Sequence, residues 1–508
     1  MYAKINSLGL FGLNAFPVGV ETQLSRGTPC FDIVGLADMA VKESRERIRA
    51  AFRSVGLQFP LARLIVNLTP AGTKKTGSMF DLPITVAIMK AQGLITADTD
   101  KCAFIGELTL AGDVHPLNGV LPMVLCAVKE GMEEVFVPAE NAFEASAAGN
   151  VTVYGVTNIS EIITHFNGEK PLTPSEKITI SPEDYYIHED YADVKGQVLA
   201  KKALEYAAAG GHNVLMIGPP GSGKSMLAKR LPTILPALTF EESIETTNIH
   251  SVAGFTSKEN PIVAKRPFRS PHHTISGAGM CGGGQIPRPG EISLAHNGVL
   301  FLDELPEFDK RTLDMLRQPL EDNKVTIARA AGSVEYPAFF VLIAAMNPCP
   351  CGFFNHPTKK CICPPNAARN YVNRISGPLL DRFDLQVEVS PVEFKSLSSN
   401  KKEESSEAIR ERVQQAREIQ QRRFAGTGIS CNARITADIF HEVCPLTQDA
   451  TDFLENIFDK MGLSARAYDR IVKVARTIAD MDGVQVIEKL HISKAVQFRT
   501  LDRKYWGN

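Results

Sequence analysis

The chain of 508 residues lacks any long hydrophobic run. No stretch approaches the ~20 uninterrupted apolar residues that a membrane-spanning helix needs, so we expect no membrane partner. The N-terminal segment, residues 1–20, carries a single lysine and no small-residue cleavage pattern, which argues against a secretory signal. We therefore expect a cytoplasmic protein.

A strong charge of one sign is also missing. The 55 Lys and Arg residues are balanced by 57 Asp and Glu residues, and the net charge is -2. Such a chain has no overall basic field that would attract nucleic acid from a distance. If nucleic acid is a partner, the contacts must be local, in a channel or a loop.

The pattern of apolar residues divides the chain into four parts. Residues 1–165 alternate short apolar runs (62–70, 104–114 and 133–139) with helical patterns such as 39–56, which predicts an α/β domain. Residues 166–187 are polar and hold three prolines, as in a linker. Residues 188–393 contain four apolar strand candidates separated by helices, which favours a parallel sheet covered on both faces. Residues 394–508 are expected to form a small helical domain.

A phosphate-binding loop is the clearest motif. The sequence GPPGSGKS lies between an apolar strand and a helix, which is the context that such a loop requires. Its backbone N–H groups are expected to face phosphate oxygens. Lys224 would reach the β- and γ-phosphates of ATP, and Ser225 would ligate Mg²⁺. The expected nucleotide-binding residues are Gly218, Pro219, Pro220, Gly221, Ser222, Gly223, Lys224 and Ser225.

Two further strands end in residues suited to ATP hydrolysis. The apolar run GVLFLDE ends in Asp303, expected in the magnesium shell, and Glu304, expected to polarise the attacking water. Another strand ends in Asn347, whose amide would orient that water. Taken alone, the acidic run is also compatible with a buried strand that has an exposed acidic end.

These motifs together resemble a known family. DVKGQ, GPPGSGKS, LFLDE, AAMN and LLDRFD follow the order of an AAA+ ATPase, and residues 266–308 resemble its magnesium-chelatase branch. The whole chain resembles the YifB/ComM family of bacterial magnesium chelatase-like proteins. The resemblance implies an α/β fold with three parts: a Lon-protease-like (S5-like) N-terminal domain, an AAA+ P-loop NTPase core and a C-terminal helical lid. It also implies helicase or branch-migration activity on DNA recombination intermediates during natural transformation.

The resemblance assigns roles to several arginines. Arg382, in LLDRFD, matches the arginine finger that reaches the γ-phosphate of a neighbouring subunit, and Arg466 matches the sensor-2 arginine of the lid. Arg374 is a second candidate for the finger, although we favour a surface ion pair for it. A finger that acts in a neighbouring subunit implies a ring, and we expect a homo-oligomer, specifically a hexamer.

Two basic segments are candidates for DNA contact. Residues 258–276 carry basic side chains with two histidines, and residues 323–337 are typical of a hairpin with Lys324 and Arg329 near its tip. Basic side chains at a pore bind phosphates without reading the base sequence. The alternative is a solvated surface. The proposed DNA-binding residues are Lys265, Arg266, Arg269, Lys324 and Arg329.

The N-terminal domain lacks the residues that a Lon-type protease needs. Met79 and Leu121 occupy the places of the nucleophilic serine and the basic lysine, and neither can perform that chemistry. Ser78 is one position away from the nucleophile. We therefore expect a non-proteolytic scaffold, in which Lys74 and Lys75 either touch DNA or are solvated.

Four of the ten cysteines form two C-x-C pairs separated by nine residues. Four thiolates are enough for a closed tetrahedral zinc site, and in the cytoplasm a disulfide is disfavoured. Because C-x₂-C is the more usual spacing, free thiols remain the alternative. We favour a structural Zn²⁺ that braces the strand end at Asn347, with His356 as a further or substitute ligand. The cysteines are Cys349, Cys351, Cys361 and Cys363.

The sequence leaves three other functions open. One is the motor subunit of a chelatase that drives metal insertion into a porphyrin, and another is an ATPase that remodels proteins. The third is a scaffold that binds ATP without hydrolysing it. Our first hypothesis remains an ATP hydrolase that moves on DNA.

Overall fold

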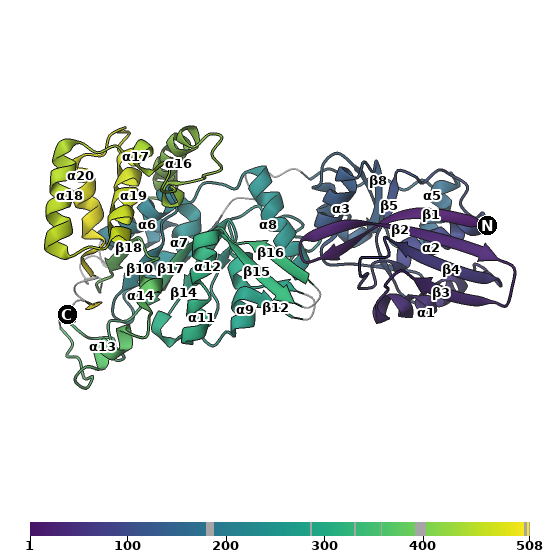
Figure 1. Ribbon diagram of the computed structural model, residues 1–508, viewed down its shortest axis with the longest axis horizontal. Helices are drawn as coiled ribbons and strands as arrows, with labels where there is room; N and C mark the ends of the chain where they lie inside the picture. The colour runs from purple at the N-terminus through teal and green to yellow at the C-terminus, as the bar shows by residue number, and fades with distance from the viewer. Residues whose placement is uncertain are drawn as a thin grey trace.

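Three structural units follow one another along an elongated molecule (Figure 1). The N-terminal domain lies at one end, a second sheet lies in the middle, and the C-terminal helices lie at the other end. Within the part of the chain that is described, no helix is long and apolar enough to cross a membrane. The computed structural model describes residues 1–178, 187–284, 287–329, 332–356, 358–391, 403–501 and 505–506.

The N-terminal domain is a mixed sheet packed between helices. Alternate residues of its strands are buried, as in the eBiBiBi pattern of β4. In sheet order the strands are β3 (Cys30–Val34), β4 (Arg63–Thr69), β2 (Asn14–Ser25), β1 (Tyr2–Phe11), β5 (Cys102–Phe104), β8 (Glu134–Pro138) and β9 (Thr152–Val156). The helices are α1 (Met39–Ser54), α2 (Asp81–Gln92), α3 (Val120–Lys129), α4 (Ala142–Ser146) and α5 (Ile159–Phe166).

The predicted elements of this domain are confirmed, with two differences. The antiparallel hairpin of β1 and β2 was not predicted, although it is the longest strand pair of the sheet. The run 104–114 forms the last residue of β5 and the short strands β6 (Glu107–Leu108) and β7 (Val114–His115). Part of the expected linker also stays on the domain, because the Ser175 N–H donates to the Val153 carbonyl at 2.7 Å.

The second sheet is parallel throughout, as predicted. Every neighbouring pair runs in the same direction, so all strands present their carboxyl ends at one edge. Alternate side chains point into two separate hydrophobic cores, one on each face. In sheet order the strands are β11 (Phe268–Arg269), β14 (Gly298–Leu302), β17 (Phe340–Met346), β10 (Val214–Ile217) and β18 (Leu385–Glu388).

Helices cover both faces of this sheet. One face carries α6 (Val198–Gly210), α7 (Lys224–Ile234) and the C-terminal helices, which share a single hydrophobic core with the sheet. The other face carries short helices and the hairpin of β15 (Lys324–Arg329) and β16 (Gly332–Pro337). The short elements are α9 (Gly277–Cys281), β12 (Gly282–Gly283), β13 (Arg288–Pro289), α10 (Glu291–Leu294), α11 (Lys310–Asp314), α12 (Arg317–Asp322), α13 (Ala367–Val372) and α14 (Gly377–Leu380).

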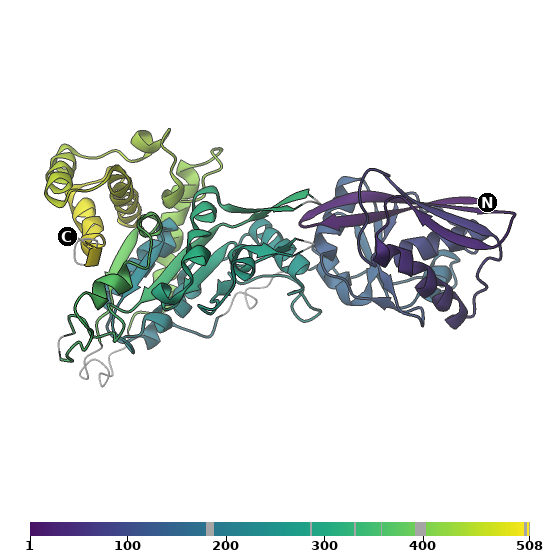
Figure 2. The same ribbon diagram turned by 60° about the horizontal axis from the view of Figure 1, so that its bottom comes forward.

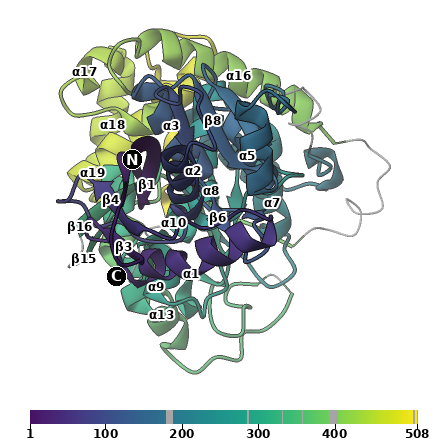
Figure 3. The same cartoon turned by 90° about the vertical axis from the view of Figure 1, so that its right-hand side faces the viewer.

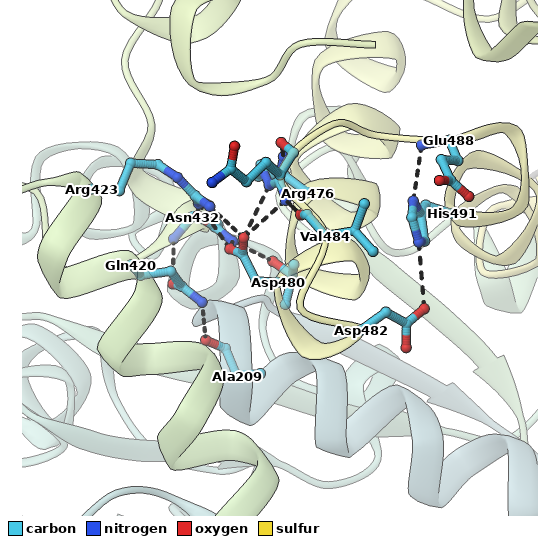
Figure 4. A network of polar contacts seen from close by, with 12 residues as sticks. Ala209, Gln420, Arg423, Asn432, Arg476, Asp480, Asp482, Val484, Glu488 and His491 are labelled. Carbon is cyan, nitrogen blue, oxygen red and sulfur yellow. Dashed lines mark hydrogen bonds and ion pairs between the residues drawn. The ribbon is translucent and has the colours of Figure 1, made fainter. Parts of the chain in front are cut away.

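A buried polar network fixes the C-terminal helices to the sheet domain (Figure 4). Asp480 is 2% exposed and accepts hydrogen bonds from Arg423, Arg476 and Asn432. Gln420 then links Asn432 to the Ala209 carbonyl at the end of α6. A buried carboxylate needs such partners, so the network holds the helices that carry Arg423 and Arg476 in one position against α6. The C-terminal helices are α16 (Ser406–Arg423), α17 (Phe440–Val443), α18 (Gln448–Met461), α19 (Ala465–Met481) and α20 (Lys489–Gln497).

The N-terminal domain meets the sheet domain at two insertions of the latter. Helix α8 (Phe240–Ala253) packs on α3, and the Gly119 N–H donates to the Ser251 carbonyl at 3.1 Å. The β15–β16 hairpin reaches the turn between β1 and β2, where Phe11 and Leu13 pack against its core (Figure 2). Viewed along the length of the molecule, the purple helix α1 lies in front and the sheet domain behind (Figure 3).

Glu144 is the central polar residue of this junction. Its carboxylate is 3% exposed and accepts hydrogen bonds from the hydroxyls of Ser251 and Thr256 across the junction. Within its own domain it accepts from the Leu121 N–H and the Asn141 amide. Burial raises the pKa of Glu144, and the hydrogen bonds oppose that rise.

We predict that Glu144→Ala loosens the junction. The change leaves several buried donors without an acceptor, so the free energy of unfolding should fall by about 3 kcal/mol. Thermal unfolding of the full chain measures the loss, and limited proteolysis should cut between the two domains sooner. Glu140→Ala is the matched control, because Glu140 is exposed on the same stretch. Equal stability of the two variants would contradict the role of Glu144.

Candidate nucleotide-binding site

The residues expected to handle ATP collect at one edge of the parallel sheet. Lys224 follows β10, Asp303 follows β14 and Asn347 follows β17, so all three lie at carboxyl ends of neighbouring strands. They enclose a cavity of about 400 Å³. Its lining is Pro220, Gly221, Ser222, Gly223, Lys224, Ser225, Met226, Asp303, Glu304, Met346 and Asn347.

The phosphate loop has the backbone that anion binding requires. Gly223 has a φ of +93°, a conformation that residues with a Cβ rarely adopt, and α7 begins at the next residue. The first residues of this helix line the cavity, and the positive end of a helix dipole favours phosphate. Lys224 is 8% exposed, and its ammonium group donates to the Gly218 carbonyl at 2.7 Å and to Asn347 Oδ1 at 3.3 Å. Burial lowers the pKa of Lys224.

Ser225 and Asp303 form a pair that fits Mg²⁺. The Ser225 hydroxyl donates to Asp303 Oδ2 at 2.6 Å across the loop–strand junction. Hydroxyl and carboxylate oxygens are the ligands that this hard cation takes, with substrate phosphates and water completing the shell. The two residues are therefore suitably placed to hold the ion.

Glu304 adopts a strained backbone at the end of β14. Its φ is +53°, in the left-handed region that is costly for a residue with a Cβ. Its N–H donates to Asp303 Oδ1 at 3.0 Å, and its side chain is 54% exposed toward the cavity mouth. Strain of this kind is typical of a functional position and is consistent with the proposed role of Glu304 in activating water.

His273 is a neighbour of Glu304 that the sequence analysis missed. Its Nδ1 lies 3.5 Å from Glu304 Oε2, and its ring packs edge-on to Phe308. His273 follows β11. Because the sequence analysis did not predict this strand, it could not place the histidine at this edge of the sheet. The only available signal was the pair of histidines in a segment that had been interpreted as basic.

Two arginines lie at the opposite edge of the sheet. Arg382 precedes the amino end of β18 and forms an ion pair with Glu321, while its own side chain is 9% exposed. Arg466, at the start of α19, is 63% exposed and lies 3.5 Å from Asp381. The two side chains therefore lie near one another and away from the phosphate loop of their own chain. Arg374 forms the surface pair that we favoured, with Glu307 at 3.1 Å.

Asp384 ties the Arg382 segment to the helix that carries Arg466. Its carboxylate accepts from the Asn213 N–H at 3.0 Å and lies 3.6 Å from Arg470 Nε. Burial tends to raise the pKa of Asp384, but His212 and Arg470 hold it at about 2. The carboxylate is thus charged at neutral pH and links the two segments.

The basic segment 258–276 is less available to DNA than its sequence suggests. Arg266 donates to the Asn297 carbonyl and forms an ion pair with Glu242. Arg269 makes a bidentate pair with Glu291, both contacts at 2.7 Å. Lys265 is exposed. The guanidinium groups of the two arginines are therefore occupied within the chain.

The hairpin 323–337 forms as predicted, but Lys324 does not lie near its tip. Arg329 is exposed beside the tip, whose residues 330 and 331 lie outside the described part. Lys324 pairs in register with Pro337 at the other end of the hairpin, so its expected place near the tip is wrong. It forms an ion pair with Glu335 at 2.8 Å.

The Lon-like places in the N-terminal domain carry no catalytic pair. Leu121 is fully buried, and Met79 packs against the domain core. The Ser78 hydroxyl donates to Glu107. Lys75 is also fully buried and donates to the Pro70 carbonyl, so the expectation that it contacts DNA or solvent is wrong. Lys74 is exposed.

The four cysteines of the two C-x-C pairs form one cluster. Their four sulfur atoms all lie within 4.8 Å of one another, and none of the four cysteines forms a disulfide. His356 is not part of the cluster that the described residues form. Its Nδ1 accepts hydrogen bonds from the backbone N–H groups of Thr358 and Lys359. The sequence hypothesis of a four-cysteine site is therefore geometrically possible without the histidine.

Fold and site together define an AAA+ ATPase of the magnesium-chelatase type. The family model "Magnesium chelatase, subunit ChlI" matches residues 190–397, and the model of the ChlI C-terminal region matches residues 403–499. A further model, "Subunit ChlI of Mg-chelatase", matches residues 20–141.

Full-length relatives narrow this class. Competence protein ComM of Haemophilus influenzae is 41% identical over 99% of this chain and 98% of its own length. YifB of Salmonella typhimurium is 40% identical over 99% of this chain and 97% of its own length. The chain belongs to the YifB/ComM family. Lon protease 2 of Bacillus subtilis is 31% identical over 28% of this chain and 27% of its own, a likeness in the N-terminal region.

We predict that His273→Ala lowers the kcat of ATP hydrolysis about tenfold. A general base contributes ~100-fold or more to the rate, and His273 would supply only the part that depends on the orientation of Glu304. The change removes the neighbour that orients Glu304, while leaving the phosphate loop intact, so KM for ATP should stay nearly constant. Steady-state ATPase kinetics provide the measurement, with Lys258→Ala as a control on the same exposed segment. An unchanged kcat would show that Glu304 acts without His273.

Proposed function

We propose that this protein is a ring-forming AAA+ ATPase that couples ATP hydrolysis to movement on DNA. Its specific task would be helicase or branch-migration activity on recombination intermediates in natural transformation, in the cytoplasm. The observation that carries the proposal is the distribution of site residues over two opposite sheet edges. A relative named as a competence protein supports the link to DNA.

In this proposal each residue of the cavity has a separate task in hydrolysis. Glu304 polarises the attacking water, and the Asn347 amide orients it. Lys224 exchanges the Gly218 carbonyl for the γ-phosphate of ATP. Mg²⁺ held by Ser225 and Asp303 would neutralise negative charge on the phosphates.

The arginine positions support hydrolysis across a subunit interface. Even along β10, which has only four residues, the amino and carboxyl ends of the strand are about 13 Å apart. Arg382 and Arg466 lie beyond the amino edge, whereas the phosphate loop begins at the carboxyl edge. They are therefore better placed to reach the ATP of a second copy than their own. A closed ring of identical subunits, which we propose is a hexamer, satisfies every site in this way.

The proposed DNA contacts rest on the exposed basic side chains. Lys265 and Arg329 are exposed as they stand. Lys324 would have to leave Glu335, and Arg266 and Arg269 would have to leave their acceptors, to contribute. Such contacts would bind phosphates of any base sequence. We also propose that the four-cysteine cluster holds a structural Zn²⁺, besides ATP and Mg²⁺ at the nucleotide site.

The first experiment is ATP-dependent processing of labelled three-way and four-way DNA junctions. Wild-type protein should resolve them, and Glu304→Gln should bind them without processing because hydrolysis is blocked. ATPase activity with no binding or processing of any junction would overturn the DNA proposal. Stimulation of the ATPase by a chelatase partner or by an unfolded polypeptide would then favour a chelatase motor or a protein-remodelling ATPase.

A mixing experiment tests whether Arg382 acts in a neighbouring subunit. Alone, Arg382→Ala should lose about 10³-fold in kcat, and Lys224→Ala should be inactive because its own site cannot bind the phosphates. Mixed, the Lys224→Ala subunits supply Arg382 to the intact sites of their neighbours, so part of the activity should return. Arg374→Ala is the matched control and should stay near wild type. No recovery in the mixture would place Arg382 outside the neighbouring site.

A further inference from the structure

The cysteine loop lies directly against the phosphate loop. It begins two residues after Asn347, whose amide accepts the hydrogen bond from Lys224. At its first turn, Gly352 has a φ of +81°, and a Cβ added there would lie only 2.4 Å from Pro220 Cδ. The turn that follows Cys351 therefore contacts the phosphate loop with no space between them. A shift of this turn toward the phosphate loop must therefore displace Pro220.

The sulfur positions match the geometry of one tetrahedral ion. The Sγ of Cys349 lies 3.4 Å from that of Cys351 and 3.8 Å from that of Cys361, and the Cys351–Cys361 distance is 3.6 Å. Four thiolates around Zn²⁺ at about 2.3 Å would place the sulfur atoms about 3.8 Å apart. The Phe354 N–H also donates to Cys349 Sγ at 3.3 Å, a contact that stabilises a metal-bound thiolate.

The loop has no hydrophobic core of its own to hold its shape. Among the described residues from 353 to 366, none is buried, and the large side chains of Phe354 and Ile362 are 37% and 83% exposed. Cys349, by contrast, is fully buried at the base of the loop. A segment that cannot form a hydrophobic core commonly depends on a metal for its conformation. In this loop, the four cysteines are the residues that could bind such a metal.

We propose that the four cysteines hold one structural Zn²⁺ and that this ion positions the phosphate loop through the turn at Gly352. Four thiolates would complete the coordination shell of the ion. Gly352 is therefore a positioning residue, and the metal would act on hydrolysis through it. The catalytic part of this inference rests on the proposed ATPase function. The metal site itself does not.

The first test removes a ligand from the full chain. Wild-type protein purified under reducing conditions should contain one equivalent of zinc by elemental analysis, and Cys361→Ser should contain far less. Replacement by Co²⁺ should give the thiolate charge-transfer absorption and the intense visible bands of a tetrahedral site. The kcat of Cys361→Ser should fall tenfold to a hundredfold, because a small displacement of catalytic groups costs about that much. Ile362→Ala is the matched control, with full zinc content and wild-type kcat.

The second test separates the contact from the metal. Gly352→Ala keeps all four thiolates but forces a Cβ against Pro220, so it should retain zinc and still lose kcat. Treating wild-type protein with a chelator should lower kcat, and added Zn²⁺ should restore it, which distinguishes metal loss from misfolding of a variant.

Each result decides a different part of the inference. A wild-type protein that contains no zinc and binds none when it is added overturns the site, as does a content of iron instead of zinc. Normal kcat in zinc-free protein or in Gly352→Ala overturns the coupling and leaves the site intact. Zinc-dependent ATPase activity without any junction processing would refute only the proposed DNA function.

Discussion

The common direction of the five central strands is the constraint on which the rest of the site depends. Because every strand presents its carboxyl end at one edge, Lys224, Asp303 and Asn347 meet there although they are far apart in sequence. The same polarity places Arg382 and Arg466 at the other edge. In the proposed ring, one sheet would thus carry a phosphate site at one edge and, at the other, the arginines that reach a neighbour's phosphate.

Buried carboxylates attach the outer units to this sheet. Glu144 joins the N-terminal domain to α8, and Asp480 joins α19 to α16 and, through Asn432 and Gln420, to α6. A buried charge is tolerated only when its partners are all in place, which makes each junction specific in geometry. The hairpin of β15 and β16, which packs against Phe11 at the β1–β2 turn, is a second contact between the sheet domain and the N-terminal domain.

Local motifs made the nucleotide site predictable from sequence, because the phosphate loop and the strand ends are each defined within a few residues. Long-range contacts were not predictable in this way. His273 reaches Glu304 through the two-residue strand β11, which is too short to give a periodic signal. Arg266 looked like an exposed cation, yet it donates to the carbonyl of Asn297, 31 residues further along the chain. Lys75 also looked exposed, but the fold buries it fully, and it donates to the nearby Pro70 carbonyl. The β1–β2 hairpin was missed because its residues looked only mildly apolar, although alternate ones are buried.

The cysteine loop illustrates how both kinds of information combine. Its four ligands are close in sequence, so their number and spacing can be recognised from the order of residues alone. Its contact with Pro220 depends on β17 and β10 lying side by side, which only the sheet order shows. Since Asn347 and Cys349 are two residues apart, the chain itself gives the loop one fixed end at the catalytic cavity. The proposed metal would fix the other end of the loop, and the phosphate loop would then be held between a strand of the sheet and a rigid turn.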